Sequence, residues 1–192
     1  NNSRIKISKL IRKNKGELIN VIYPNVIISD NIKLGSGIFI AKNTSINTLS
    51  SIGDDVIINT GAIIEHHCEI FSGVHIAPGV VLLGNVKVKE HSFIGANSVI
   101  KQGVVIGKNC RIGGAAMFTG HLSVCDNVDI SAGSLVSKSI LKSGRYTSVY
   151  PLSEHGAWKK NASAIRHLSE LNSRIKQLEV LLSKVSSEGD SQ

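Results

Sequence analysis

The sequence predicts a parallel β-solenoid followed by a helical C-terminal segment. Between residues 26 and 139 every sixth residue is apolar at one phase, nineteen times in succession and without an insertion. A period of six matches neither an α-helix nor a heptad, and it is typical of short flat strands wound into coils. Aromatic residues make up only 4% of the chain, which fits a narrow aliphatic interior. The anchors are Ile28, Leu34, Ile40, Ile46, Ile52, Ile58, Ile64, Ile70, Ile76, Leu82, Val88, Ile94, Ile100, Ile106, Ile112, Phe118, Val124, Ile130 and Val136.

Residues 1–25 form the first segment. We expect a short amphipathic helix over residues 5–18 and a strand-like stretch over residues 18–23, which Pro24 closes. This piece is too short to bury a core of its own. It is therefore predicted to be the remnant of a truncated domain.

Residues 26–139 form the solenoid domain. Three hexads make one roughly triangular coil of about 18 residues, so the pattern predicts about six coils whose strands stack in parallel. The anchors point inward. The small or polar residue after each anchor is expected at the turn, where glycine carries no Cβ penalty. These positions include Gly35, Ala41, Gly53, Asn59, Ala77, Gly95, Gly107 and Gly113.

Residues 140–192 form a C-terminal loop and helix. A helix is expected from about Glu154 to Ser186, and its apolar residues alternate at spacings of four and three. This heptad seam predicts an α-helical coiled coil. About three heptads are marginal alone, so the seam implies self-association of a body that is already oligomeric. The seam residues are Ala164, Leu168, Leu171, Ile175, Leu178, Leu182 and Val185.

Charge and cysteine content narrow the function classes. The formal net charge is +8, which favours an anionic small-molecule partner. No basic cluster carries interleaved aromatic residues, so nucleic acid is not expected. Cys68, Cys110 and Cys125 match no zinc spacing and indicate a reducing compartment. No apolar run reaches the ~20 residues of a membrane span, and we see no signal peptide, so a cytoplasmic protein is expected.

The histidines carry the strongest chemical signal. Asn59 and the run Glu65-His66-His67 place polar groups at one corner of the solenoid. A neutral imidazole accepts a proton near pH 7, and an acid such as Glu65 can hold its tautomer. His75 follows His66 by nine residues, which is half a coil. The two imidazoles are therefore expected on different faces of one chain, where they meet only across a subunit boundary.

Simpler interpretations of these histidines stay open. His66 and His67 could be exposed turn residues, and His91 is expected to be a solvated turn residue. No metal site is expected, because adjacent side chains on an extended turn diverge. His66, His67 and His75 would then not supply the three or four convergent ligands that zinc needs.

Residues 61–68, 74–79, 84–88 and 93–100 resemble the sugar acetyltransferases of the sialic acid and bacillosamine type, which are left-handed β-helix acyltransferases. Residues 1–24 resemble the last helix and strand of that family's nucleotide-sugar-binding domain. The resemblance implies a left-handed coil, acetyl-CoA as cosubstrate and a homotrimer with active sites between subunits. It implies His66 as general base and His75 as a contact to acetyl-CoA, with backbone around Gly84, Ala96 and Gly114 lining the coenzyme groove. The family usually has Asp or Glu where this chain has His67.

From about Arg111 the resemblance changes. Residues 111–128, 144–148, 151–152 and 158–162 are similar to UDP-3-O-acylglucosamine N-acyltransferase, the lipid A enzyme. That likeness implies that His121 lies near the acyl-chain and active-site region, and that the terminal helices pack together in a trimer. The hexad phase crosses the change intact. We therefore hypothesise a chimera of the two families, joined near Arg111.

Three functions follow from these observations. The first is an acetyl-CoA-dependent acetyltransferase that acts on a nucleotide-linked amino sugar by direct transfer, with Glu65, His66 and His67 as catalytic residues. Asn59 and His121 would bind the substrate. The second is an acyl-carrier-protein-dependent UDP-acylglucosamine N-acyltransferase. The third is not enzymatic: an engineered trimeric scaffold with a vestigial site. An ice-binding solenoid is disfavoured because no regular Thr-x-Thr face appears.

Overall fold

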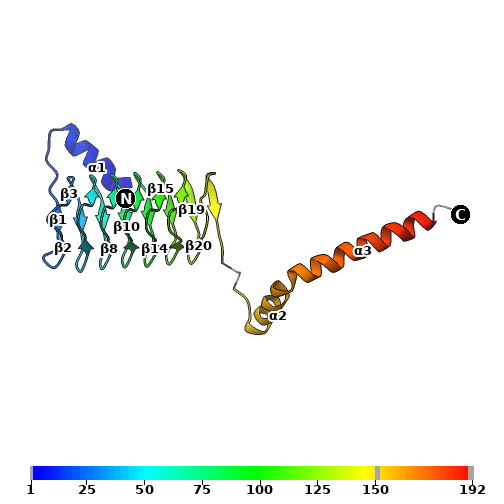
Figure 1. The fold of residues 1–192 in the computed structure, drawn as a ribbon. Coiled ribbons are helices and arrows are strands. Elements are labelled where there is room, and N and C mark those ends of the chain that lie inside the picture. Colours follow the sequence, from blue (N-terminus) through cyan, green and yellow to red (C-terminus); the bar gives the residue numbers. More distant parts are fainter. Residues whose placement is uncertain (1, 150–151, 190–192) are drawn as a thin grey trace. The chain divides into compact units, whose positions relative to one another are not determined.

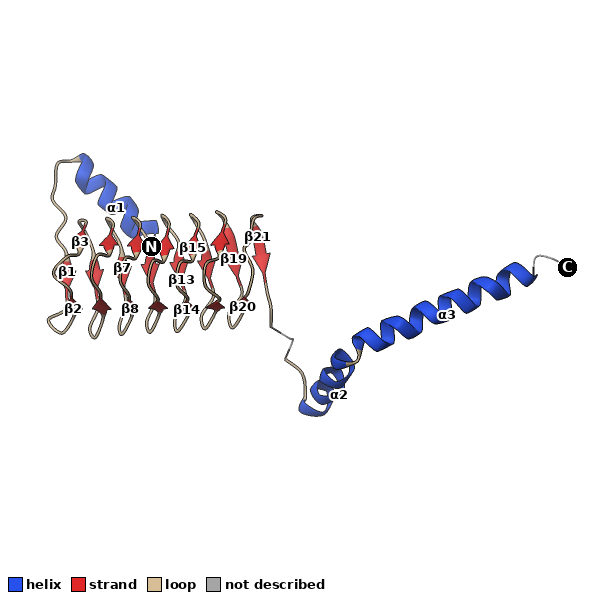
Figure 2. Cartoon of the chain, in the orientation of Figure 1, coloured by secondary structure: helices blue, strands red, loops and turns tan. Residues whose placement is uncertain are grey.

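The computed structural model describes residues 2–149 and 152–189, and it confirms the parallel β-solenoid (Figure 1). Helix α1 (Asn2–Lys13) precedes the strands, and helices α2 (His155–Arg166) and α3 (Leu168–Gly189) follow them. The chain divides into two compact units, residues 1–149 and residues 150–192. The solenoid and α1 belong to the first unit, and α2 and α3 belong to the second (Figure 2).

The solenoid strands form three parallel sheets, here called A, B and C. Sheet A holds β1 (Val21–Ile22), β4 (Phe39–Ile40), β7 (Ile57–Ile58), β10 (His75–Ile76), β13 (Phe93–Ile94), β16 (Arg111–Ile112), β19 (Val128–Ile130) and β21 (Gly144–Tyr146). Sheet B holds β2 (Ile27–Ile28), β5 (Ser45–Ile46), β8 (Ile63–Ile64), β11 (Val81–Leu82), β14 (Val99–Ile100), β17 (Met117–Phe118) and β20 (Leu135–Val136). Sheet C holds β3 (Lys33–Leu34), β6 (Ser51–Ile52), β9 (Glu69–Ile70), β12 (Lys87–Val88), β15 (Val105–Ile106) and β18 (Ser123–Val124).

Stacking places each strand beside the strand 18 residues further on. Ile57 of β7 pairs with His75 of β10, which in turn pairs with Phe93 of β13. With eight, seven and six strands in its sheets, the solenoid makes about seven turns, one more than the sequence predicts. The extra length comes from β1 and β21, which lie outside the hexad repeat and pair with β4 and β19. The architecture is consistent with the left-handed β-helix that the resemblance implies.

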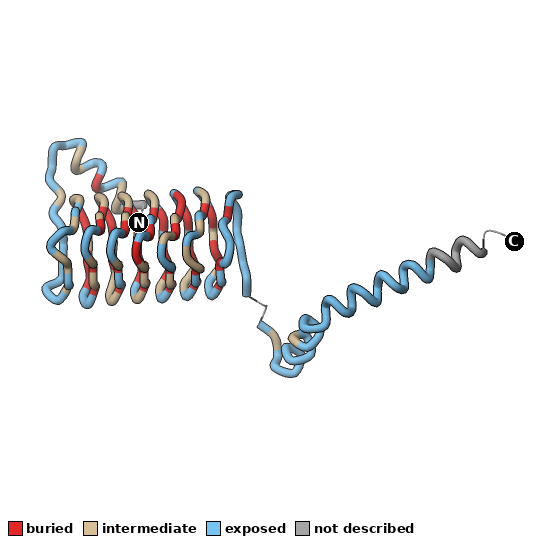
Figure 3. Tube along the Cα trace, in the orientation of Figure 1, coloured by how far each residue is buried: buried red, intermediate tan, exposed pale blue. Residues whose placement is uncertain are grey.

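The anchors fill the core, as the periodicity predicts (Figure 3). All seventeen anchors from Ile40 to Val136 are buried, and none is more than 8% exposed. β-Branched and aliphatic side chains suit these positions because one face of each short strand turns inward. The first two anchors differ: Ile28 is partly buried and Leu34 is 37% exposed. The first coil has a neighbouring coil on only one side, which leaves its interior partly open.

The expected position of the turn residue is wrong. From Gly37 to Gly133 every sixth residue has a φ between 54° and 71°, and this left-handed residue is the third after each anchor. Residues directly after the anchors are small for another reason, because the next coil approaches them closely. A Cβ on Gly35 would lie 2.8 Å from the backbone nitrogen of Asp54, and the same crowding occurs at Gly53, Gly95, Gly107 and Gly113. Ala41 and Ala77 at this position are buried.

Helix α1 lies along the corner where sheet C turns into sheet A. Ser8 is buried and its hydroxyl donates to Asp55 Oδ2 at 2.8 Å, while Arg12 Nη1 lies 2.6 Å from the same oxygen. Arg4 donates to the backbone oxygens of Asp55 and Gly37. Residues 1–25 therefore pack on the solenoid as part of its compact unit. Their origin in a nucleotide-sugar-binding domain stays a prediction.

The C-terminal unit contains two helices where the sequence predicts one. His167 interrupts the helix with a φ of −103° and a ψ of 10°, and its N–H donates to Ala164 O. A four-three spacing of apolar residues continues across this point, so the pattern cannot reveal the break. The seam residues Leu168, Leu171, Ile175, Leu178 and Leu182 are exposed, and the side chain of Val185 lies outside the described residues. The coiled coil stays a prediction.

Candidate active site

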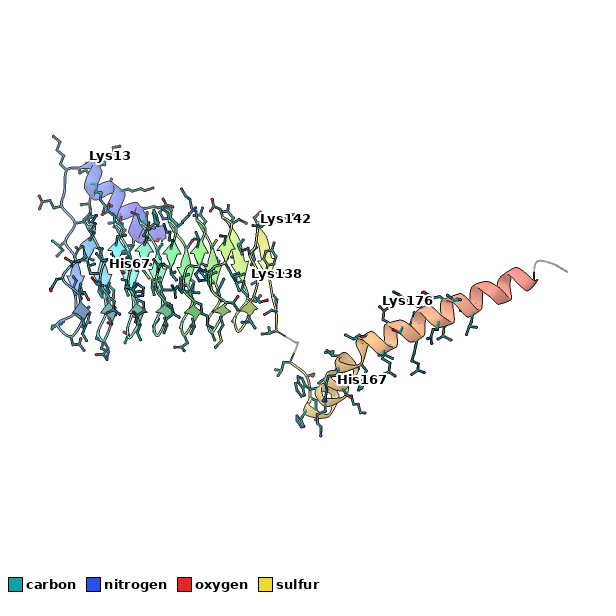
Figure 4. The ribbon with its side chains drawn as sticks, in the orientation of Figure 1. Lys13, His67, Lys138, Lys142, His167 and Lys176 are labelled. Carbon is teal, nitrogen blue, oxygen red and sulfur yellow. The ribbon has the colours of Figure 1, made fainter. Side chains whose placement is uncertain are left out.

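His66 and His67 lie in the turn from β8 to β9, at the corner where sheet B turns into sheet C, here called the BC corner (Figure 4). His67 has a φ of 59°, a conformation in which histidine is enriched together with Asn and Asp. Backbone bonds fix this turn between two coils. The N–H of His67 donates to Thr48 O at 3.1 Å, and the N–H of Asn85 donates to His66 O at 3.0 Å.

The two imidazoles contact each other directly. Nδ1 of His66 lies 3.0 Å from Nδ1 of His67, and the rings meet edge to face with centroids 5.2 Å apart. One Nδ1 must donate and the other must accept. For Nε2 of His66 to take up a proton, its Nδ1 must carry the hydrogen and donate to His67. His67 can thus select the tautomer that a general base needs, without supplying the negative charge of a carboxylate.

Gly84 makes room for the His66 ring on the next coil. A Cβ at this position would lie 2.6 Å from Nε2 and closer still to Cε1 of His66. No side chain fits between the ring and the backbone there. Gly84 and His66 therefore occupy one place in the fold, which the sequence had assigned to the coenzyme groove and the base separately.

Glu65 is anchored through its backbone. Its N–H donates to Leu82 O at 2.9 Å and its carbonyl accepts from Ser50 Oγ at 2.9 Å. Among the described residues, its carboxylate has no hydrogen bond to either imidazole, and the contact to His66 comes from His67 instead. The catalytic role of Glu65 stays a prediction.

Cys68, beside the histidines, is not a reactive thiol. Burial raises its pKa to about 11, and its thiol donates to Leu83 O at 3.2 Å. The thiolate is the nucleophilic form of cysteine, so this side chain is inert near neutral pH. Burial also raises the pKa of Cys110. Covalent catalysis by these cysteines is disfavoured, which leaves direct transfer.

His121 lies on the BC corner three coils after His67. It has a φ of 60°, its N–H donates to Gln102 O at 2.8 Å, and its ring lies against Gly103. The corner thus carries imidazoles at both ends of a stretch that holds Gly84 and Gly103 between them. The substrate-binding role predicted for His121 stays a prediction.

The other predicted site residues lie elsewhere on the coil, on sheet A or where it turns into sheet B. His75 begins β10, half-buried, with its ring 5.1 Å from that of Phe93 at 87°. Its Nε2 is buried and has no hydrogen-bond partner among the described residues. Burial lowers the pKa of His75, and the positive charge of Arg4 adds to this effect.

Asn59, Ala96 and Gly114 complete this second group. Asn59 Oδ1 accepts the N–H of Thr60 at 2.8 Å, and the carbonyl of Ala96 lies 3.2 Å from where a Cβ of Gly114 would be. Within one chain the structure therefore separates the predicted site into two groups. The first holds Glu65, His66, His67, Gly84 and His121 on the BC corner, and the second holds Asn59, His75, Ala96 and Gly114.

Sequence reasoning missed Phe93 and Arg4 as neighbours of His75. Phe93 was detectable, because it follows His75 by 18 residues and so lies beside it on the next coil. Arg4 had no such signal, since α1 lies outside the repeat. In the described part of the chain no group of three or more His, Cys, Asp or Glu is placed to hold a metal ion. Nor does any helix in that part have the length and apolarity to cross a membrane.

Comparison with known proteins identifies the repeat. Residues 67–102 and 85–120 match the model of the bacterial transferase hexapeptide (six repeats). Residues 104–138 match the hexapeptide repeat of succinyl-transferase. These residues are transferase hexapeptide repeats. The hexads that the sequence predicts are thus the repeating unit of known bacterial transferases.

Sugar acetyltransferases are among the similar solved structures. PerB from Caulobacter crescentus, in complex with CoA and GDP-perosamine, is 27% identical with a TM-score of 0.60, over 77% of this chain and 63% of that chain. WeeI from Acinetobacter baumannii is 30% identical with a TM-score of 0.63, over 66% and 61% of the two chains. The acetyltransferase domain of PglB from Neisseria gonorrhoeae, in complex with acetyl-CoA, is 25% identical with a TM-score of 0.55, over 79% and 66%.

Curated relatives match a shorter segment. UDP-3-O-acylglucosamine N-acyltransferase from Bordetella avium is 60% identical over 67 residues, which is 35% of this chain and 19% of that protein. The same enzyme from Janthinobacterium is 48% identical over 67 residues. This chain spans about a fifth of the length of these relatives. Both resemblances that the sequence predicts are therefore found, and together they support a hybrid hexapeptide-repeat transferase.

Proposed function

We propose that this chain is an acetyltransferase that moves an acetyl group from acetyl-CoA to the amine of a nucleotide-linked amino sugar. The observation that carries the proposal is the His66 imidazole, which His67 holds at 3.0 Å and Gly84 leaves room for. Support comes from similar structures with CoA, acetyl-CoA or GDP-perosamine bound. The excess of 22 basic over 14 acidic residues suits anionic substrates.

The proposed chemistry needs one proton acceptor and no covalent intermediate. The amine nitrogen attacks the thioester carbonyl and forms the N–C bond, while Nε2 of His66 takes the amine proton. Collapse of the tetrahedral intermediate breaks the C–S bond, and the proton on Nε2 passes to the departing thiolate. His67 accepts the Nδ1 hydrogen of His66 throughout, which keeps Nε2 directed at the reacting amine.

We further propose a homotrimer in which His75 of one copy faces His66 of the next. Within one chain these residues lie on different parts of the coil, so neither is close to the other. The outward positions of sheet B support an interface, because Ile27, Ile63, Met117 and Leu135 are between 38% and 69% exposed. A row of exposed apolar side chains of this length favours contact with another protein surface.

Activity and subunit mixing test both proposals. His66→Ala should abolish acetyl transfer, and unchanged activity excludes His66 as the base. His66→Ala and His75→Ala chains, unfolded together and refolded as mixed trimers, should regain about one quarter of wild-type activity. In random mixing, about that fraction of interfaces pairs an intact His66 with an intact His75. If each variant alone is inactive and the mixture stays inactive, a site shared between copies is refuted.

A second candidate function is transfer of a longer acyl chain from an acyl carrier protein. The 60% identity to UDP-3-O-acylglucosamine N-acyltransferase over 67 residues favours it. Donor competition separates the two functions. Turnover with acetyl-CoA but not with hydroxyacyl carrier protein supports the first, and the reverse result supports the second.

A further inference from the structure

Leu49 holds an unusual conformation on the BC corner, one coil before His67. Its φ is 59° and its side chain is 55% exposed. Fifteen of the seventeen left-handed positions between Gly37 and Gly133 hold Gly, Asn, Asp or His. The two exceptions are Ala115 and Leu49, so Leu49 has the only long aliphatic side chain among these described positions.

Two features of this position are unfavourable for leucine. A positive φ brings Cβ toward the following carbonyl oxygen, and leucine has no polar side-chain atom that could compensate as Asn or Asp does. Its exposed side chain also leaves apolar surface in water. Strained residues of this kind concentrate at functional sites. An apolar contact from outside the chain would give Leu49 a benefit that its own fold does not.

Hydrogen bonds fix Leu49 beside the candidate base. Thr48 O accepts the N–H of His67 at 3.1 Å. Ser50 Oγ donates to Glu65 O at 2.9 Å and accepts the N–H of Cys68 at 3.0 Å. The two residues that flank Leu49 are thus bonded at three points to the turn that carries the histidines, so Leu49 cannot move independently of His66 and His67.

Leu49 and Gly84 lie on opposite sides of this turn along the solenoid. The ring of His66 lies over Gly84, on the coil after its own, and Leu49 is on the coil before. On the Gly84 side the chain presents bare backbone, which suits the slender arm of the acyl donor. The acceptor then approaches from the side of Leu49.

We propose that Leu49 is a specificity-determining residue that contacts an apolar group of the acceptor sugar, such as the methyl group of a deoxy amino sugar. This inference rests on the proposed acetyltransferase function. It assigns the acceptor to the Thr48–Leu49 side of the base and predicts discrimination between sugars with a methyl group and sugars with a hydroxymethyl group at the same carbon.

The test compares Leu49→Asn with Leu49→Met. Asparagine adopts the left-handed conformation, as Asn85 does on the next coil but one, but it removes the apolar surface. With GDP-perosamine and its 6-hydroxy analogue as probes, Leu49→Asn should raise the acceptor KM for the methyl sugar about tenfold and remove the preference between the two. The KM for acetyl-CoA should not change, and the thermal midpoint should rise. Leu49→Met should keep the acceptor KM within about twofold, since it keeps an apolar side chain of similar volume.

The outcomes separate this inference from the function on which it rests. If the wild-type chain transfers acetyl groups and Leu49→Asn leaves the acceptor KM unchanged, the inference is overturned alone. A parallel rise of both KM values overturns it as well, because a general distortion of the site explains that result. Weakened assembly with an unchanged acceptor KM assigns Leu49 to a subunit contact and also overturns it. If the wild-type chain acetylates neither probe nor any other amino sugar nucleotide, the proposed function fails and the inference fails with it.

Discussion

Replacement of Gly84 by alanine is expected to disable the base without unfolding the solenoid. Gly84 is not in the left-handed region, so alanine can adopt its backbone conformation. The new Cβ would lie 2.6 Å from Nε2 of His66, whereas ordinary contacts begin near 3.4 Å. The ring must therefore move by about 1 Å, and a misplacement of that size costs about 100-fold in rate. Because the ring is exposed and can rotate, the free energy of unfolding should change by no more than about 1 kcal/mol.

Steady-state kinetics and thermal unfolding measure the two effects separately. Gly84→Ala should lower kcat about 100-fold at saturating donor and acceptor, with an almost unchanged midpoint. A double-mutant cycle with His66→Ala supplies the control, since residues in contact give non-additive effects. In the His66→Ala background, Gly84→Ala should cost little more. A kcat within threefold of wild type, or an equal loss in both backgrounds, would refute the placement of the ring over Gly84 as the source of its role.

Three further predictions concern stability. The raised pKa of Cys68 means that the unfolded thiol ionises above about pH 9 and the folded thiol near pH 11, so urea unfolding should show a loss of about 2–3 kcal/mol between these values, and Cys68→Ala should reduce it. The lowered pKa of His75 has the opposite sign: the unfolded imidazole binds a proton first as the pH falls below about 6.5, so acid destabilises the fold, and an equal acid sensitivity in His75→Phe would contradict this. Asp55→Asn breaks the 2.6 Å pair with Arg12, which is partly exposed, so the docking of α1 should weaken by about 1–2 kcal/mol; hydrogen exchange over residues 2–13 should accelerate, and unchanged exchange would show that Ser8 and Arg4 suffice.

The repeat made the solenoid predictable because its side chains obey one local rule. Ile40 and Val136 stand 96 residues apart in the sequence, yet both are buried for the same reason, which is their phase in the hexad. The separation of His66 from His75 follows from the same rule. The number of coils did not, because β1 and β21 pair with the solenoid without continuing the hexad phase.

The remaining features depend on contacts that local patterns do not encode. The left-handed residue was misplaced because small residues occur both at turns and where coils approach closely, as at Gly35. Docking of α1 relies on Arg4 and Asp55, which are 51 residues apart and belong to different kinds of structure. The contact between the two Nδ1 atoms of His66 and His67 depends on side-chain rotation, so adjacency in sequence could suggest it but not establish it.

The backbone bonds between coils also bear on how such a chain can change its length. Asn59 N–H donates to Ile76 O, and Ala77 N–H donates to Ile94 O, so each bond spans the same 17 residues wherever it lies. Each coil therefore contacts only the coils beside it. Insertion or deletion of one complete coil leaves every other pairing intact, whereas an insertion of any other length displaces all inward side chains beyond it. Viable length variants of this solenoid are thus expected to differ by multiples of about 18 residues, and segments from unrelated parents can be exchanged at any coil boundary.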